Sequence, residues 1–228
     1  MQKAIEHLLQ NPAIRQANFA PMAMRPGRST GFAALDEVLP GGGWPIGSLT
    51  EILVDRQGIG ELSLLMPALA TASEEQRWIA WVSPPHIPYG PALAAKGIDL
   101  ARILLIHARP GPDTLWAVEQ ALASGTCSSV LSWLDDELDN RMLRRLQLAA
   151  ESGQSTGFLF RPSDHVNLPS PAALRLGIET TSHGLVIKVL KCRGRSGATM
   201  MLDVDHDLVE PVFSHLGAGR RQTRQFQH

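Results

Sequence analysis

Between residues 50 and 160, short apolar runs alternate with longer segments whose apolar residues recur every three or four positions. The short runs have the length of buried strands, and the longer segments have the period of helices. The predicted strands are Thr50–Val54, Trp78–Val82, Ile103–Ile106, Ser129–Leu134 and Gly157–Phe160. The predicted helices are Leu62–Ala72, Gly90–Lys96, Asp113–Ala123 and Asp135–Ser152. Because strands and helices alternate, we predict an α/β fold with a mainly parallel sheet that is flanked by helices.

The pattern changes beyond Pro162, where three β-rich segments follow one another with turns between them. They predict an antiparallel β extension of the sheet. These segments are Ala173–Thr180, Leu185–Cys192 and Thr199–Asp205. At the other end, Ile5, Leu8 and Leu9 have helical spacing within residues 2–10. The pattern therefore predicts three parts: an N-terminal helix and arm (1–28), a core with its β extension (29–205), and a basic, flexible tail (206–228).

Charge is distributed unevenly along the 228 residues, although the net charge is only −1. Residues 1–28 and 185–228 each carry a net charge of +3, which leaves −7 for the centre. Basic ends permit contacts with nucleic acid or with an acidic partner. Cys127 and Cys192 are too few and too far apart for a disulfide framework or a Cys-x-x-Cys metal site. The first residues contain no long apolar run, so we expect a cytoplasmic protein without a membrane anchor.

A glycine-containing loop follows the first predicted strand, with the sequence Asp55-Arg56-Gln57-Gly58-Ile59-Gly60-Glu61-Leu62. A nucleotide-binding P-loop has Gly-x-x-x-x-Gly-Lys-Ser/Thr at this place, with a lysine that reaches the phosphates and a hydroxyl that holds magnesium. Here Asp55 replaces the first glycine, Glu61 replaces the lysine, and Leu62 replaces the hydroxyl residue. Two carboxylates repel a polyphosphate. We therefore expect no bound nucleotide, no other cofactor and no metal ion.

The stretch from Ser29 to Phe160 resembles the core of RecA-family ATPases. The likeness includes the glycine-rich segment Ser29–Gly47, the degenerate loop, and the amino-acid sequence of Trp116–Gly125. Pro85 stands where that family has its catalytic glutamate, and the strand that carries its magnesium-associated aspartate here ends near Trp133. The resemblance implies a RecA-like P-loop core that has lost ATP hydrolysis, a pseudo-ATPase without catalytic residues.

Two branches of this superfamily, ImuA and SulA, lack the ATPase residues and resemble the chain more closely. Both share the segments Trp81–Pro84, Val130–Asp136 and Gly157–Pro162. SulA-like chains are short, whereas this chain keeps Ser29–Gly47 and continues for more than sixty residues beyond Pro162. On that ground the chain is identified as a member of the ImuA family.

Resemblance to ImuA implies a non-catalytic adaptor of SOS-induced, mutagenic translesion DNA synthesis. Its expected partners are an ImuB-like Y-family polymerase homologue, RecA and a DnaE-type error-prone polymerase, with direct contact to DNA left open. The alternative is a SulA-like inhibitor of cell division that binds FtsZ. A third hypothesis is a weak nucleotide- or DNA-binding module.

Basic residues near the C-terminal end are the predicted partner-binding positions. They form a predicted hairpin and part of the tail: Lys188, Lys191, Arg193, Arg195, Arg220, Arg221 and Arg224. The surface that meets each partner does not follow from the sequence.

Overall fold

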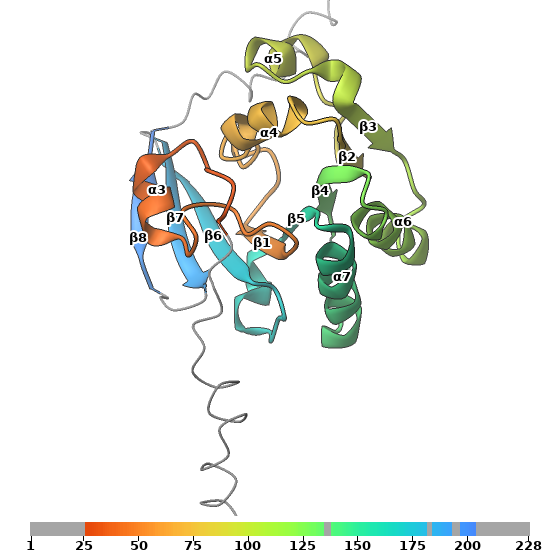
Figure 1. Cartoon of the computed structure of the whole chain (residues 1–228). Helices are drawn as coiled ribbons and strands as arrows, with labels where there is room; N and C mark the ends of the chain where they lie inside the picture. Colours follow the sequence, from red (N-terminus) through yellow and green to blue (C-terminus); the bar gives the residue numbers. More distant parts are fainter. Residues whose placement is uncertain (1–25, 135–137, 182–183, 193–196, 204–228) are drawn as a thin grey trace, which may run out of the picture.

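The computed structural model describes residues 26–134, 138–181, 184–192 and 197–203. Within them, one sheet runs in the order β3-β2-β4-β5-β1-β6-β7-β8, with helices on both sides (Figure 1). The strands are β1 (Leu49–Val54), β2 (Trp78–Val82), β3 (Ile103–Ile106), β4 (Cys127–Trp133), β5 (Thr156–Pro162), β6 (Leu174–Thr181), β7 (Gly184–Lys191) and β8 (Thr199–Leu202). The helices are α3 (Ala33–Val38), α4 (Met66–Ser73), α5 (Gly90–Ala95), α6 (Pro112–Ala123) and α7 (Asn140–Gly153), with 3-10 turns η1 (Leu100–Arg102) and η2 (Ser163–Asn167). The predicted α/β class with a flanked, mainly parallel sheet is confirmed.

The sheet is parallel from β3 to β6 and antiparallel from β6 to β8. Strand β1 lies between β5 and β6 and is parallel to both. The predicted antiparallel extension is found in β6, β7 and β8, and its first strand joins the core by parallel pairing with β1. The segment from 163 to 173, which contains η2, crosses back along the sheet and lets β6 run in the same direction as β1.

Each face of the sheet has its own hydrophobic cluster. In β1, Ile52 and Val54 point to the face covered by α3 and α4, and Leu49 belongs to the cluster with α6 and α7 (Figure 1). Since successive strand residues point to opposite faces, a strand covered on both sides must be apolar at nearly every position. All six residues of β1 are buried, as this arrangement requires.

Aromatic side chains line the α4 face near the carboxyl ends of three neighbouring strands. The rings of Trp133 and Phe160 are stacked with centroids 4.7 Å apart, and Trp81 lies 5.8 Å from Trp133. Trp44, which precedes β1, meets Phe158 edge to face at 5.3 Å. These contacts fill the α4 side of the core with apolar surface.

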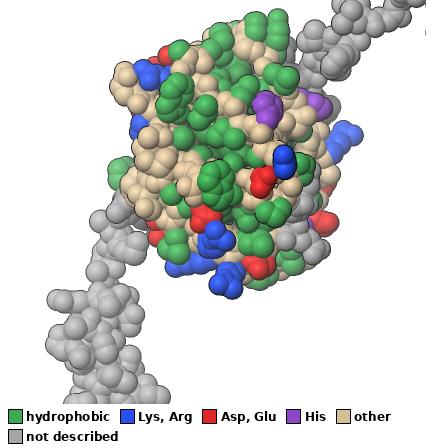
Figure 2. Space-filling model, turned by 90° about the vertical axis from the view of Figure 1, so that its right-hand side faces the viewer, with side chains coloured by type: hydrophobic (Ala, Val, Ile, Leu, Met, Phe, Trp, Pro, Cys, Tyr) green, Lys and Arg blue, Asp and Glu red, His purple; other side chains and the backbone are tan. Residues whose placement is uncertain are grey.

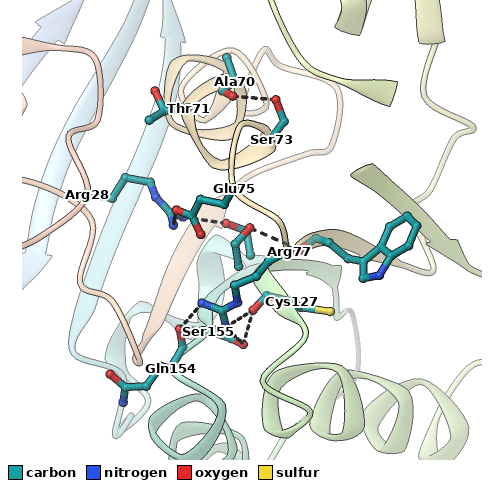
Figure 3. A network of polar contacts seen from close by, with 12 residues as sticks. Arg28, Ala70, Thr71, Ser73, Glu75, Arg77, Cys127, Gln154 and Ser155 are labelled. Carbon is teal, nitrogen blue, oxygen red and sulfur yellow. Dashed lines mark hydrogen bonds and ion pairs between the residues drawn. The ribbon is translucent and has the colours of Figure 1, made fainter. Parts of the chain in front are cut away.

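At the opposite, amino end of the sheet, two arginines join segments that are distant in sequence (Figure 3). Arg77 donates to the carbonyl oxygens of Cys127, Gly153 and Gln154, the last two at the end of α7. A guanidinium favours this position because the last carbonyls of a helix are unpaired and carry partial negative charge. Arg28 pairs with Glu75 and donates to the hydroxyl of Ser129.

Two helices begin later than the sequence predicted. Helix α4 begins at Met66 instead of Leu62, because residues 61–65 form turns closed by short-range bonds such as Leu65 N–H to the Leu62 carbonyl. Helix α7 begins at Asn140, and the Asp139 carboxylate caps it by accepting from Met142 N–H. A residue that caps a helix this way is extended, so the predicted start at Asp135 was wrong.

Some predictions concern residues outside the described ones. They are the helix at residues 2–10, the basic tail, and the boundary at 205 that separates the tail from the core. Among the described residues, no helix has both the length and the apolar character needed to cross a bilayer. The same residues hold no group of three or more His, Cys, Asp or Glu side chains placed to share a metal ion.

Candidate functional site

The glycine loop lies at the carboxyl end of β1, where parallel α/β sheets place their ligand sites. Residues 55–58 are exposed, and Ile59, Gly60 and Glu61 are buried. Gly58 and Gly60 adopt φ angles of +78° and +94°, which glycine reaches without the steric cost of a side chain. The hydroxyl of Thr180 on β6 donates to the carbonyl of Ile59 at 2.8 Å and ties the loop to the sheet.

The carboxylate of Glu61 occupies the inside of its own loop. Its two oxygens accept from the backbone N–H groups of Gly58 at 3.0 Å and Ile59 at 2.9 Å, and the residue is only 3% exposed. In a working P-loop, backbone N–H groups of this kind cradle a phosphate. Glu61 thus folds back into its own loop, and helix α4 begins five residues after it. Asp55 is exposed at the rim of the loop.

A cavity of about 350 Å³ lies beside the loop, at the carboxyl ends of β1 and β5. It is lined by Val54, Asp55, Arg56, Gln57, Phe160, Arg161 and Pro162. Its lining carries one acidic and two basic side chains. Asp55 is the one carboxylate in this lining, so the lining holds no pair of carboxylates.

Three charged side chains are buried next to this cavity, on the α7 face of β1, β5 and β6. Glu51 accepts from Arg161 Nη1 at 2.8 Å and forms an ion pair with Arg175 Nε at 2.6 Å. Arg175 also donates to the carbonyls of His165, Val166 and Leu168, which fixes η2 against the sheet. This buried group of two guanidiniums and one carboxylate has a net charge of +1.

Strand β3 is the other exposed feature of interest, since it pairs only with β2 among the described residues. Its sequence is Ile-Leu-Leu-Ile, and Leu104 and Leu105 are each about 40% exposed. The prediction of a buried strand at Ile103–Ile106 was wrong because the strand lies at an edge. Exposed apolar side chains on flanking elements extend this surface: Trp78, Ile87, Tyr89, Leu100 and Trp116. Figure 2 shows this side of the molecule, with hydrophobic side chains gathered across its centre.

An edge strand without charge is unusual for a protein that stays monomeric, because its free N–H and C=O groups invite another strand. Natural proteins usually protect such an edge with lysine, proline or a bulge. None of the four residues of β3 is charged or a proline. We call the group formed by β3 and its apolar neighbours the β3 edge surface.

Two of the predicted partner-binding residues are described, and both lie on β7. Lys188 pairs with Glu179 across the β6–β7 ladder, and Lys191 donates to the carbonyl of Ser170 at 2.7 Å. Arg193, Arg195 and the tail arginines Arg220, Arg221 and Arg224 lie outside the described residues. The structure thus places the two lysines on one strand, far along the sheet order from β3.

Sequence reasoning missed the buried charges and the β3 edge surface. A signal for the charges exists: Glu51, Arg161 and Arg175 each stand next to an apolar residue of a strand, and charged residues are rarely buried unless they are paired. The position of β3 had no such signal. An apolar run of four residues looks the same in the centre of a sheet and at its edge.

Comparison with known proteins gives a consistent result. The family described as "Cell division inhibitor SulA" matches residues 47–157, which contain β1 to β4 and the start of β5. The SulA of Pectobacterium carotovorum is 33% identical over 116 residues, covering 51% of this chain and 69% of that protein. The chain belongs to the SulA family.

Two further SulA proteins are similar to this chain. The SulA of Photorhabdus laumondii is 39% identical over 101 residues, covering 44% of this chain and 56% of that protein. The crystal structure of SulA from Pseudomonas aeruginosa is 31% identical and covers 50% of this chain and 97% of that one, with a TM-score of 0.42. The match thus spans little more than half of the Photorhabdus relative.

The assignment to ImuA was wrong. It depended on the segments outside the shared core, Ser29–Gly47 and the residues beyond Pro162, whereas the family match rests on the core itself. The partners and the role in translesion synthesis that ImuA implied were therefore wrong as well. Those partners were an ImuB-like polymerase homologue, RecA and a DnaE-type polymerase. Extra strands at one side of a sheet leave the core unchanged, so length alone does not separate two families that share that core.

Proposed function

We propose that this protein is a non-catalytic inhibitor of cell division that acts by binding FtsZ. Membership of the SulA family carries this proposal, because the relatives that match are cell division inhibitors. A cytoplasmic location, where FtsZ assembles, is part of the proposal.

The filled glycine loop supports a function by binding instead of catalysis. The order of β1, loop and α4 agrees with a P-loop core that has lost its nucleotide, and the Glu61 carboxylate takes the backbone donors that a phosphate would need. An incoming phosphate would have to displace a carboxylate held by two charge-assisted hydrogen bonds. We therefore propose that the chain neither binds nor hydrolyses ATP.

The β3 edge surface supports partner binding. A partner strand that pairs with Ile103–Ile106 would satisfy the free backbone groups of this edge, and its side chains would cover Leu104 and Leu105. Contiguous exposed apolar surface of this kind typically marks an interaction site. The basic residues Lys188 and Lys191 stay a second proposed contact, although each already has a partner within the chain.

Sedimentation of FtsZ polymers tests the proposal directly. Purified FtsZ is assembled with GTP in the presence of increasing amounts of the full chain, and the pelleted fraction is measured. We expect the pelleted fraction to fall as this protein approaches an equal molar ratio. Full assembly at a several-fold excess of the protein, together with no FtsZ binding in calorimetry, would reject the proposal. A calorimetric titration with Mg-ATP in the same buffer tests separately whether the glycine loop excludes ATP.

A further inference from the structure

The side chain of Arg161 has two hydrogen-bond donors that no group in the described structure accepts. Its Nη1 donates to Glu51, whereas Nε and Nη2 are buried and lack a hydrogen-bond partner. The residue is 2% exposed. A buried donor without an acceptor is costly, and for a charged guanidinium the cost is larger than for a neutral group.

The two unpaired nitrogens lie on the same edge of the guanidinium. Nε–H and one Nη2–H point in parallel and form the fork that donates to both oxygens of a carboxylate at once. Nη1, on the remaining side, is already committed to Glu51. The donor pattern therefore fits one planar oxyanion better than a scattered set of single acceptors.

Charge around the fork also favours an anion. The cavity that Arg161 lines includes Arg56 and Asp55, and the buried group behind it consists of Glu51 and Arg175. These five side chains sum to +1. A monoanion would neutralise this charge, and a dianion such as phosphate would overshoot it beside Asp55.

We propose that the cavity at the carboxyl ends of β1 and β5 binds a small monocarboxylate, with the Nε–Nη2 edge of Arg161 as its main donor. The cavity of about 350 Å³ is within the range of small-molecule sites, so the carboxylate has room for a few further heavy atoms. Val54 and Phe160 line the same cavity and offer apolar contact to them. This site is separate from the β3 edge surface and from the loop interior that Glu61 fills.

Calorimetry and thermal unfolding of the full chain with sodium acetate and with sodium propionate test the proposal, against sodium chloride at equal ionic strength. We expect saturable binding of both carboxylates, weaker binding of phosphate, and none of chloride. The variant R161K keeps a positive charge for Glu51 and removes the fork, so its affinity should drop at least about tenfold, as expected for losing a bidentate charge-assisted pair. The variant R175K is the matched control, because it alters the other arginine of the buried group and leaves the fork in place.

A second variant keeps the test decisive if R161K does not fold. Asp55 is exposed and lies in the cavity lining, so D55N removes one repulsive charge without touching a buried contact. It should bind acetate more tightly than the wild type, by about two- to fivefold from one screened charge near the site. Equal effects of acetate and chloride on the wild type and D55N would overturn the proposal, and so would a crystal structure with only water molecules on the fork.

Discussion

The glycine loop and the β3 edge surface show opposite treatments of backbone polar groups. In the loop, the donors that could hold a ligand are taken by Glu61 from the same chain. Along β3, the outer row of backbone groups has no partner among the described residues, and the side chains around it are apolar. The place where ligands normally bind in this architecture is thus closed from within, while a place that is normally protected is open. Variants of the loop region should therefore change stability, and variants of the edge should change binding.

The largest expected effect concerns the buried charges beside the loop. E51A leaves the guanidiniums of Arg161 and Arg175 buried without their carboxylate, and should lower the free energy of unfolding by about 3–5 kcal/mol. Urea denaturation of the purified protein measures it. E119A, which breaks the more exposed pair with Arg145, is the control and should cost at most about 1 kcal/mol. Similar losses for both variants would mean that the buried group contributes no more than a surface pair.

Opening the loop should have the next largest effect. E61A leaves the N–H groups of Gly58 and Ile59 without an acceptor and should cost about 1.5–3 kcal/mol, since hydrogen bonds to a charged group are lost. E61Q keeps one acceptor and should lose less. Chemical denaturation gives both values, and binding of FtsZ by the folded fraction should stay at the wild-type level. Weakened FtsZ binding by E61A would instead place the loop inside the interface with FtsZ.

A charge on the edge strand should weaken binding of FtsZ and leave stability nearly unchanged. L105K puts a lysine on the β3 edge surface and should weaken FtsZ binding at least about tenfold, which corresponds to about 1.4 kcal/mol. Stability should change by no more than about 0.5 kcal/mol because the side chain is already 39% exposed. M201K is the matched control, on the strand at the other edge of the sheet, with Met201 61% exposed. Equal binding by L105K and the wild type would show that the partner uses another surface.

The smallest expected effect concerns the reactivity of the two cysteines. It also shows whether the L105K variant keeps its core closed. Burial raises the pKa of the Cys127 thiol above its ordinary value of 9.0, so the native protein has little thiolate at this position at pH 8. Cys192 is partly exposed. A thiol reagent should modify Cys192 first and Cys127 only after unfolding in urea, with C192S as the control that isolates the slow site. Because the folded pKa lies above the unfolded one, Cys127 favours the folded state less as pH rises beyond 9. Rapid labelling of both thiols in L105K would indicate an opened core.

Much of this fold was predictable because its core strands are apolar and its helices are periodic. Strand β2 was predicted with its observed bounds, and α6 differs by one residue at its start. The failures have local causes. Helix α4 starts late because the Glu61 carboxylate holds the loop residues in turns, and β6 runs parallel to β1 because η2 returns the chain before it. Periodicity reports neither a carboxylate that bonds to its own loop nor the strand beside which the chain returns.

The candidate site was harder to predict than the fold. The sequence shows that Glu61 replaces the P-loop lysine. It does not show that the Glu61 carboxylate binds backbone N–H groups of its own loop. Glu51 and Arg161 are 110 positions apart, so their pairing follows only from the neighbouring places of β1 and β5 in the sheet. The assignment between two related families failed for a similar reason, since it gave weight to the terminal segments and too little to the shared core.

The order of strands has a consequence for synthesis on the ribosome. Strand β1 is the first strand of the sheet to be made, yet its partners β5 and β6 come last among the parallel strands, with Leu49 opposite Gly157. The 108 positions from Leu49 to Gly157 take roughly 5–20 s to translate at bacterial and eukaryotic elongation rates. During that interval the apolar strand β1 has neither of its neighbouring strands. Arg77 also cannot yet donate to the carbonyls at the end of α7. The nascent chain thus depends on late residues to bury its earliest ones, and chaperones that bind exposed apolar strands have a defined interval in which to act.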